Sequence, residues 1–313
     1  MATASAGAGV APAAARTRSA RPGRHSFRLA LPWLAPLLTV ATAFYLWPTI
    51  QAIRLSFTNA TLLRDDAQYT LETYGQTLSD PTLGSVLRIT AIFVAGSIIG
   101  QLVLGLAIAL LVQRAVARRL RGAVVVRTIV LCAWVMPGIL IGVVWQIVLN
   151  EGPYGLVNLF LSTLGLDPVA FLSKPDLALG SVTVANIWRG TAFSMLLLYA
   201  GLQTVNRELY EAAAVDGASR VRQFWHVTLP QLRPVLLVNV VLITIATLNT
   251  FDMILPLTGG GPAQATEVLA LHVYNTVFIN FNIASGSVFA VFLLLIGLGL
   301  TAIYRRLLRA EAL

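Results

Sequence analysis

Six long stretches that carry almost no charge dominate this sequence of 313 residues. They lie at about residues 29–55, 86–113, 126–150, 177–205, 235–257 and 285–305. A helix needs about 20 predominantly apolar residues to cross the hydrocarbon core of a bilayer, and each stretch is that long. Only 11% of the residues are charged, whereas soluble domains contain about 25%. We therefore predict an all-α integral membrane protein in which residues 29–308 form one domain of six transmembrane helices.

The segments outside these stretches have a different character. Residues 268–281 are apolar but too short to span a bilayer, and they include His272, so we expect an interfacial helix there. Residues 1–28 consist largely of Ala, Gly, Ser, Pro and Arg, which predicts a disordered basic tail. Residues 309–313 form a short C-terminal tail.

The basic residues predict the orientation of the chain. Cytoplasmic segments of membrane proteins carry an excess of Lys and Arg. Here 17 of the 22 basic residues fall in alternate segments, namely the N-terminal tail, residues 114–127, residues 206–233 and the C-terminal end. Both termini are therefore expected in the cytoplasm. The net charge of +9 then reflects orientation in the bilayer and does not indicate nucleic-acid binding.

The cytoplasmic segment at residues 206–233 is unlike the other loops, because its sequence predicts structure. Residues 208–216 are strong helix formers, and Gly217 supplies the left-handed residue that ends a helix. Ser219 can cap a second short helix, which we expect Pro230 and Pro234 to end before the fifth span. This helix, glycine turn and helix could dock on a partner protein or lie on the inner leaflet.

The small side chains of this segment favour close approach by a partner. Ala212 and Ala213 add no bulk, and Glu211 offers a charge that a partner arginine could pair with.

The sequence predicts no metal site. The three histidines are far apart, and the chain has a single cysteine.

Arg189 and Asp252 are the two ionisable residues that the sequence places well inside spans. Such residues are costly at membrane depth and usually face a cavity or a partner. Two interpretations stay open: the pair locks the fourth and fifth spans together, or both residues line a translocation path. Thr247 and Thr250 bring further polar groups to the same depth, although hydroxyls in membrane helices often bond their own backbone.

The spacing in residues 211–230 resembles one known family. Glu211-Ala212-Ala213 is followed by Asp216-Gly217 and then by Leu229-Pro230, with Val227 at a position where Ile is usual. This pattern is similar to the diagnostic motif of the permease subunits of binding-protein-dependent ABC importers. The motifs at residues 45–58 and 251–262 resemble the carbohydrate-uptake branch, which includes maltose, trehalose and glycerol-phosphate systems. The resemblance covers about residues 29–308.

The resemblance implies a fold, a location and a set of partners. It implies the type I importer permease fold in the bacterial cytoplasmic (inner) membrane, with a second homologous permease subunit, two ATP-binding subunits and an extracytoplasmic sugar-binding protein. Residues 206–233 would couple to the ATPase through the seven motif residues Glu211, Ala212, Ala213, Asp216, Gly217, Leu229 and Pro230. Asn186, Trp188, Gly190 and Phe193 would join Arg189, Thr247, Thr250 and Asp252 along the substrate path.

The chain itself is expected to be a transport subunit and not an enzyme. It contains no G-x-x-x-x-G-K-[ST] motif and only one lysine, Lys174, so ATP and Mg²⁺ would be bound by the partner ATPase and this chain would bind no cofactor. The alternative is an ion-coupled secondary transporter. That class uses internal repeats and buried carboxylate relays, for which the spans offer only Asp252.

Overall fold

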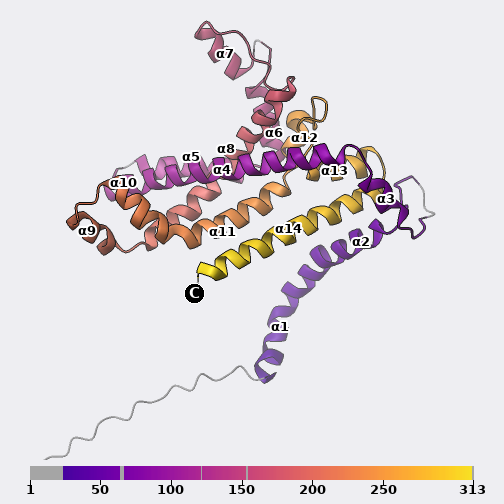
Figure 1. Cartoon of the computed structure of the whole chain (residues 1–313), viewed down its shortest axis with the longest axis horizontal. Coiled ribbons are helices and arrows are strands. Elements are labelled where there is room, and N and C mark those ends of the chain that lie inside the picture. Colours follow the sequence, from indigo (N-terminus) through magenta and orange to yellow (C-terminus); the bar gives the residue numbers. More distant parts are fainter. Residues whose placement is uncertain (1–23, 64–66, 121, 153, 312–313) are drawn as a thin grey trace, which may run out of the picture. The chain divides into compact units, whose positions relative to one another are not determined.

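The computed structural model describes residues 24–63, 67–120, 122–152 and 154–311, and the regular elements in these ranges are helices (Figure 1). The chain divides into two compact units, one ending at Gln51 and the other beginning at Ala52. The first unit contains α1 (Arg24–Ala41) and a π turn (Thr42–Leu46), after which α2 (Trp47–Ser56) begins. Residues 32–56 are helical, and long and apolar enough to cross a membrane.

The prediction of a disordered tail over residues 1–28 is partly wrong. Residues 1–23 lie outside the described residues, but α1 already begins at Arg24.

The second unit contains the remaining helices. Their bounds are α3 (Glu72–Leu78), α4 (Leu83–Ala117), α5 (Gly122–Val135), α6 (Gly138–Val148), α7 (Leu156–Thr163), α8 (Pro175–Thr204), α9 (Arg207–Val215), α10 (Arg220–Gln223), α11 (Leu229–Leu248), α12 (Ile254–Thr258), α13 (Leu269–Tyr274) and α14 (Ile283–Glu311). Among the described residues, four helices are long and apolar enough to span a membrane, and the bent pair α5–α6 makes a fifth. The predicted fourth span corresponds to α8, which is long enough but carries more polar side chains.

Helices α4 and α8 pack closely because glycines on α4 face α8. A Cβ added at Gly105 would lie 2.6 Å from Ser194 Cβ, and one added at Gly96 would lie 3.1 Å from Thr183 Cγ2. Small residues at membrane helix contacts let backbones approach, which strengthens dispersion contacts that lipid cannot replace. The two helices therefore form a tightly packed pair that positions the polar residues of α8.

A buried apolar cluster joins this pair to the shorter helices. It contains Phe93 of α4, Ile141 of α6, Val182 of α8, Ile254 of α12 and Leu271 of α13, each at most 2% exposed. A side chain fully removed from solvent contributes about 1.5–3 kcal/mol relative to its exposed state. The cluster holds α6 and α12 against the middle of α8.

The predicted third span at residues 126–150 is a broken helix. The axis bends by 107° between α5 and α6. Pro137 lies at the break with ψ of 140°, because proline provides no N–H for the helix and its ring clashes with the preceding turn. The prediction of one continuous helix is therefore wrong at residues 136–137.

The predicted fifth span also differs from residues 235–257. Pro230 and Pro234 do not end the short helix before it, since the helix is continuous from Arg220 to Leu248. A π turn (Phe224–Thr228) leads into α11, and the Leu229 N–H bonds to the Phe224 carbonyl. Pro230 follows shortly after this π turn, and the wider turn accommodates a proline within the continuous helix.

Helix α11 ends at Leu248, nine residues before the predicted boundary. The Asn249 amide donates to the Ile245 carbonyl at 2.8 Å, and the Thr250 hydroxyl donates to the Ala246 carbonyl at 3.0 Å. These side chains satisfy carbonyls of the last turn. Asp252 consequently lies in the non-helical link between α11 and α12, and not inside a helix.

Residues 268–272 are buried within the protein, whereas Phe278, Ile279 and Phe281 at the other end of the segment are 44–61% exposed. The prediction of an interfacial helix over residues 268–281 is therefore wrong for its first half. The segment forms α13 followed by a π turn (Asn275–Ile279), and the Leu269 N–H donates to Thr90 Oγ1 of α4 at 2.8 Å. His272 Nδ1 lies 2.9 Å from Glu267 Oε1. The contact with Glu267 satisfies His272 Nδ1, whereas the buried His272 Nε2 has no hydrogen-bond partner among the described residues.

Candidate functional site

The predicted cytoplasmic element is present and closely resembles the expected helix, turn and helix (Figure 1). Asn206 caps α9, because its side-chain oxygen accepts from the Glu208 N–H at 3.0 Å. Gly217 ends the helix with φ of +73°, and the Ala218 N–H donates to the Ala213 carbonyl at 2.8 Å. This is a Schellman turn, which requires the left-handed conformation that glycine adopts without strain.

The second helix of the element begins where the sequence predicts it. Ser219 is the N-cap of α10, with its hydroxyl 3.4 Å from the Arg222 N–H. The Gln223 amide donates to the Ala218 carbonyl at 3.2 Å and so closes the turn. The Tyr210 hydroxyl lies 2.9 Å from the buried Thr228 hydroxyl, which ties α9 to the start of α11.

The motif residues of α9 and its turn lie at the surface. Glu211, Ala212, Asp216 and Gly217 are exposed, and Val215 is 88% exposed. The two ion pairs among the described residues, Arg189–Asp252 and Glu267–His272, do not involve this element. The element therefore presents small side chains and an acidic group at the surface. Leu229 and Pro230 belong to the first turn of α11.

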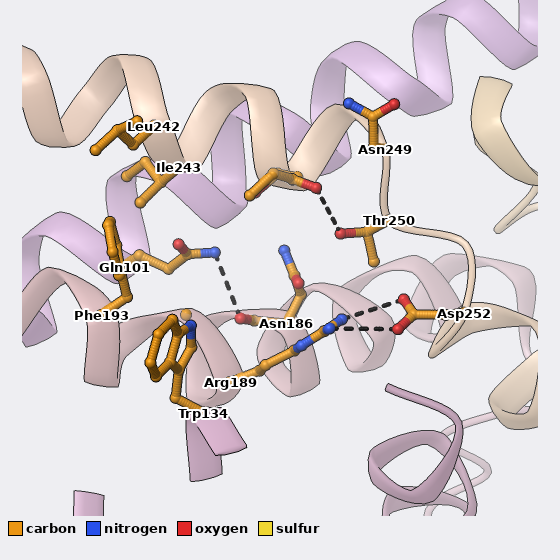
Figure 2. Close-up of a pocket in the computed structure, with 13 residues that line it drawn as sticks. Gln101, Trp134, Asn186, Arg189, Phe193, Leu242, Ile243, Asn249, Thr250 and Asp252 are labelled. Carbon is orange, nitrogen blue, oxygen red and sulfur yellow. Dashed lines mark hydrogen bonds and ion pairs between the residues drawn. The ribbon is translucent and has the colours of Figure 1, made fainter. Parts of the chain in front are cut away.

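A second site is an open cavity of about 450 Å³ lined by α4, α5, α8, α11 and the link that follows α11 (Figure 2). Its lining consists of polar and aromatic side chains with a few aliphatic ones: Gln101, Trp134, Asn186, Arg189, Gly190, Phe193, Leu242, Ile243, Ala246, Thr247, Asn249, Thr250 and Asp252. Ligand pockets typically measure about 300–1,000 Å³ and combine apolar walls with a few oriented polar groups. The cavity has this character.

Arg189 and Asp252 form a two-pronged ion pair in the cavity wall. The Nη1 to Oδ1 distance is 3.1 Å and the Nη2 to Oδ2 distance is 3.3 Å, and the side chains are 27% and 35% exposed (Figure 2). A Cβ added at Gly138 would collide with the Asp252 carboxylate, which therefore occupies the space above the first residue of α6. The two interpretations of these residues are compatible, because they pair with each other and also line the cavity.

The amides of the cavity wall are fixed by neighbouring groups. The Asn186 amide donates to Ser97 Oγ at 2.9 Å, and the Gln101 amide lies 3.4 Å from the Asn186 carbonyl. A Cβ at Gly190 would collide with the Gln101 amide, so glycine at that position makes room for it. Trp134 and Phe193 add an aromatic wall, with ring centroids 5.8 Å apart.

The structure brings seven of the eight predicted path residues together. Asn186, Arg189, Gly190, Phe193, Thr247, Thr250 and Asp252 all line the cavity. Trp188 does not, since its ring lies edge-on to Trp145 at a centroid distance of 6.1 Å. Sequence reasoning missed Gln101 and Trp134. Gln101 could have been found as the single amide within residues 89–112, which carry no charge.

The chain is similar in sequence to several known transport proteins. A family model described as the binding-protein-dependent transport system inner membrane component matches residues 101–311. The trehalose/maltose transport system permease protein MalF of Thermococcus litoralis is 36% identical over 272 residues, which cover 87% of this chain and 90% of that protein. The sn-glycerol-3-phosphate transport system permease protein UgpA of Brucella abortus is 34% identical over 278 residues, covering 86% and 90% of the two chains.

The fold also matches a solved structure. A chain of a bacterial ABC transporter involved in the import of the acidic polysaccharide alginate superimposes with a TM-score of 0.78. The match covers 91% of this chain and 96% of that chain at 21% identity, so it bears on the fold alone.

Proposed function

Because the chain belongs to the family of inner-membrane components of binding-protein-dependent transport systems, we propose that it is a permease subunit of an ATP-driven importer for a sugar or related polyol. Relatives that carry trehalose and maltose or sn-glycerol 3-phosphate support this class of substrate. The chain forms the translocation path and performs no covalent chemistry. The observation that carries the proposal is the exposed Glu211–Gly217 turn, which leads without a helix break from Arg220 into the wall of the cavity.

Coupling to the ATPase occurs through α9. Its exposed alanines allow close contact with a cleft on the ATP-binding subunit, and Glu211 pairs with a basic residue there. Tyr210 and Thr228 transmit movement of α9 to the start of α11. ATP and Mg²⁺ are bound by two partner subunits, since this sequence has no phosphate-binding loop of its own.

The chain crosses the bacterial cytoplasmic membrane six times. The spans correspond to residues 32–56, α4, the bent pair α5–α6, α8, α11 and α14. Both termini lie in the cytoplasm, where the basic ends of the chain are favoured. In the assembled importer this subunit pairs with a second homologous permease and receives substrate from an extracytoplasmic sugar-binding protein.

The cavity is the part of the path that contacts substrate. Amide groups at Gln101 and Asn249 can bond hydroxyl groups, and the rings of Trp134 and Phe193 provide an apolar face for a sugar ring. An ion-coupled secondary transporter is not favoured, because the one carboxylate in the cavity lining, that of Asp252, is already paired with Arg189.

The test is a double variant, Glu211→Lys with Gly217→Arg. Lysine repels the basic partner residue, and arginine is strained at φ of +73°, so both changes disrupt docking. In vesicles that contain the complete importer, ATP-dependent uptake of the sugar bound by its cognate binding protein should fall by at least about tenfold, the effect of losing about 1.4 kcal/mol of coupling.

The amount of subunit in the membrane should stay unchanged. Glu208→Lys is the matched control, because it makes the same charge change on the same helix, outside the motif. Unimpaired uptake in the double variant would refute the coupling role.

A further inference from the structure

The cavity contains one positive and one negative side chain, and they neutralise each other. Arg189 and Asp252 are the charged residues in its lining, and both contacts between them are hydrogen-bonded. A guanidinium recognises phosphate or sulfonate by offering two parallel N–H groups to two oxygens. Here the Asp252 carboxylate already occupies such a pair of N–H groups.

The position of Asp252 is fixed by its surroundings. Gly138 leaves the space that the carboxylate fills, and the next two residues, Met253 and Ile254, are fully buried. The carboxylate therefore cannot move far from Arg189 without disturbing the packing of α6 and α12. An anion that entered the cavity would meet a neutralised arginine and an adjacent negative charge, which is unfavourable by Coulomb's law at short range.

The same pair remains able to bind hydroxyl groups. A guanidinium has five N–H donors and a carboxylate has about four acceptor positions, so two hydrogen bonds leave capacity on both sides. Hydroxyl groups can both donate and accept, and they can use the two residues at once. Asn249 and Gln101 supply amides that also act in both directions.

We propose that this cavity takes an uncharged polyhydroxylated ligand and discriminates against phosphorylated or sulfonated ones, with Asp252 setting that preference by neutralising Arg189. The inference rests on the proposed function in one respect, namely that the cavity is part of the substrate path. The proposal narrows the substrate class to neutral sugars, such as trehalose and maltose, and excludes glycerol phosphate.

The experiment measures the charge preference of the cavity with a cysteine reporter. Cys132 is the single cysteine, so Cys132→Ser followed by Ala246→Cys places one thiol at an exposed position in the cavity wall. The full chain, in its complex in lipid nanodiscs, is reacted with two methanethiosulfonates of similar size. One carries a sulfonate and the other a trimethylammonium group. The readout is the ratio of the anionic rate to the cationic rate.

Changing one partner of the ion pair should shift this ratio strongly. Asp252→Asn frees Arg189 and should raise the ratio by at least about tenfold, whereas Arg189→Gln should lower it by a similar factor, as expected for a unit charge roughly 10 Å away at moderate dielectric. The double variant should return the ratio to within about twofold of the parent. A reporter at Val215, which is 88% exposed on α9, should show no shift.

Ligand protection identifies the preferred class. Trehalose and maltose together should slow modification of the reporter when the ion pair is intact, and sn-glycerol 3-phosphate should slow it only after Asp252→Asn. Protection of the intact pair by the phosphate, absence of protection by the neutral sugars, or an unchanged rate ratio in both single variants would each overturn the proposal. None of these measurements involves ATP or Glu211, so a failure here is distinct from a failure of coupling.

Discussion

The Tyr210 hydroxyl lies 2.9 Å from Thr228 Oγ1, and this contact joins the surface helix α9 to the turn from which α11 begins. Tyr210→Phe keeps the ring but removes the hydrogen bond, which is worth about 1 kcal/mol. We expect sugar uptake per ATP hydrolysed to fall by about two- to fivefold. The measurement is parallel uptake and phosphate release in vesicles that contain the complete importer. Tyr199→Phe should have no effect, since Tyr199 makes no side-chain hydrogen bond within the described residues.

Two glycines of α8 should respond in opposite ways to the same change. Gly180→Ala adds a methyl group in open space and should stabilise the helix by about 0.5–1 kcal/mol. Gly190→Ala forces the Gln101 amide out of its position, and should destabilise the protein by about 1–3 kcal/mol. Thermal unfolding of the purified variants in one detergent compares them. Equal melting temperatures would mean that Gln101 does not pack on Gly190.

Variants of two tryptophans should distinguish a residue that lines the cavity from a neighbour that does not. Trp134 lines the cavity, whereas Trp188 packs edge-on against Trp145 outside it. Trp134→Ala should raise the KM of uptake by about tenfold, which corresponds to about 1.4 kcal/mol of lost contact with the sugar ring. Trp188→Ala should leave KM within about twofold while lowering stability. The opposite pattern would place the substrate on the other side of α8.

Acid should weaken the part of the protein around α13 through Glu267. The hydrogen bond from His272, together with that from Asn275, lowers the pKa of Glu267 below its ordinary value of 4.5. A carboxyl whose pKa is lower in the folded state stabilises the fold above pH 4.5, and this contribution is lost as the pH falls through the lowered value.

The matching variant is Glu267→Gln. It should unfold more easily than the parent at pH 7, by about 1–3 kcal/mol, and the difference should shrink below pH 4.5. Melting temperatures across this pH range measure the effect. Asp167→Asn changes an exposed carboxyl and should show no such trend. A constant gap between parent and Glu267→Gln at every pH would contradict the assignment.

Sequence patterns correctly predicted the elements that are determined by a few adjacent residues. The N-cap at Ser219 and the left-handed Gly217 depend on a few adjacent residues, and both are found where expected. The pairing of Arg189 with Asp252 was one of the two interpretations that the sequence left open, because opposite charges at membrane depth have few other ways to be satisfied.

The features that sequence reasoning missed depend on distant parts of the chain. A continuous apolar run does not reveal the bend at Pro137, since proline can either kink a membrane helix or be absorbed by it, as Pro230 is. Burial of residues 268–272 depends on contacts with α4 that lie about 180 positions away, such as that between Leu269 and Thr90. Trp134 could not be assigned to the cavity before the break after α5 was known.

The continuous helix from Arg220 to Leu248 has a mechanical consequence. Its 29 residues correspond to a length of about 43 Å. One end adjoins the Gly217 turn, and the other carries Ala246 in the cavity wall. A tilt of about 5° around the midpoint moves each end by roughly 2 Å, in opposite directions. If the helix pivots as one body, a small movement at the Gly217 turn changes the width of the cavity directly.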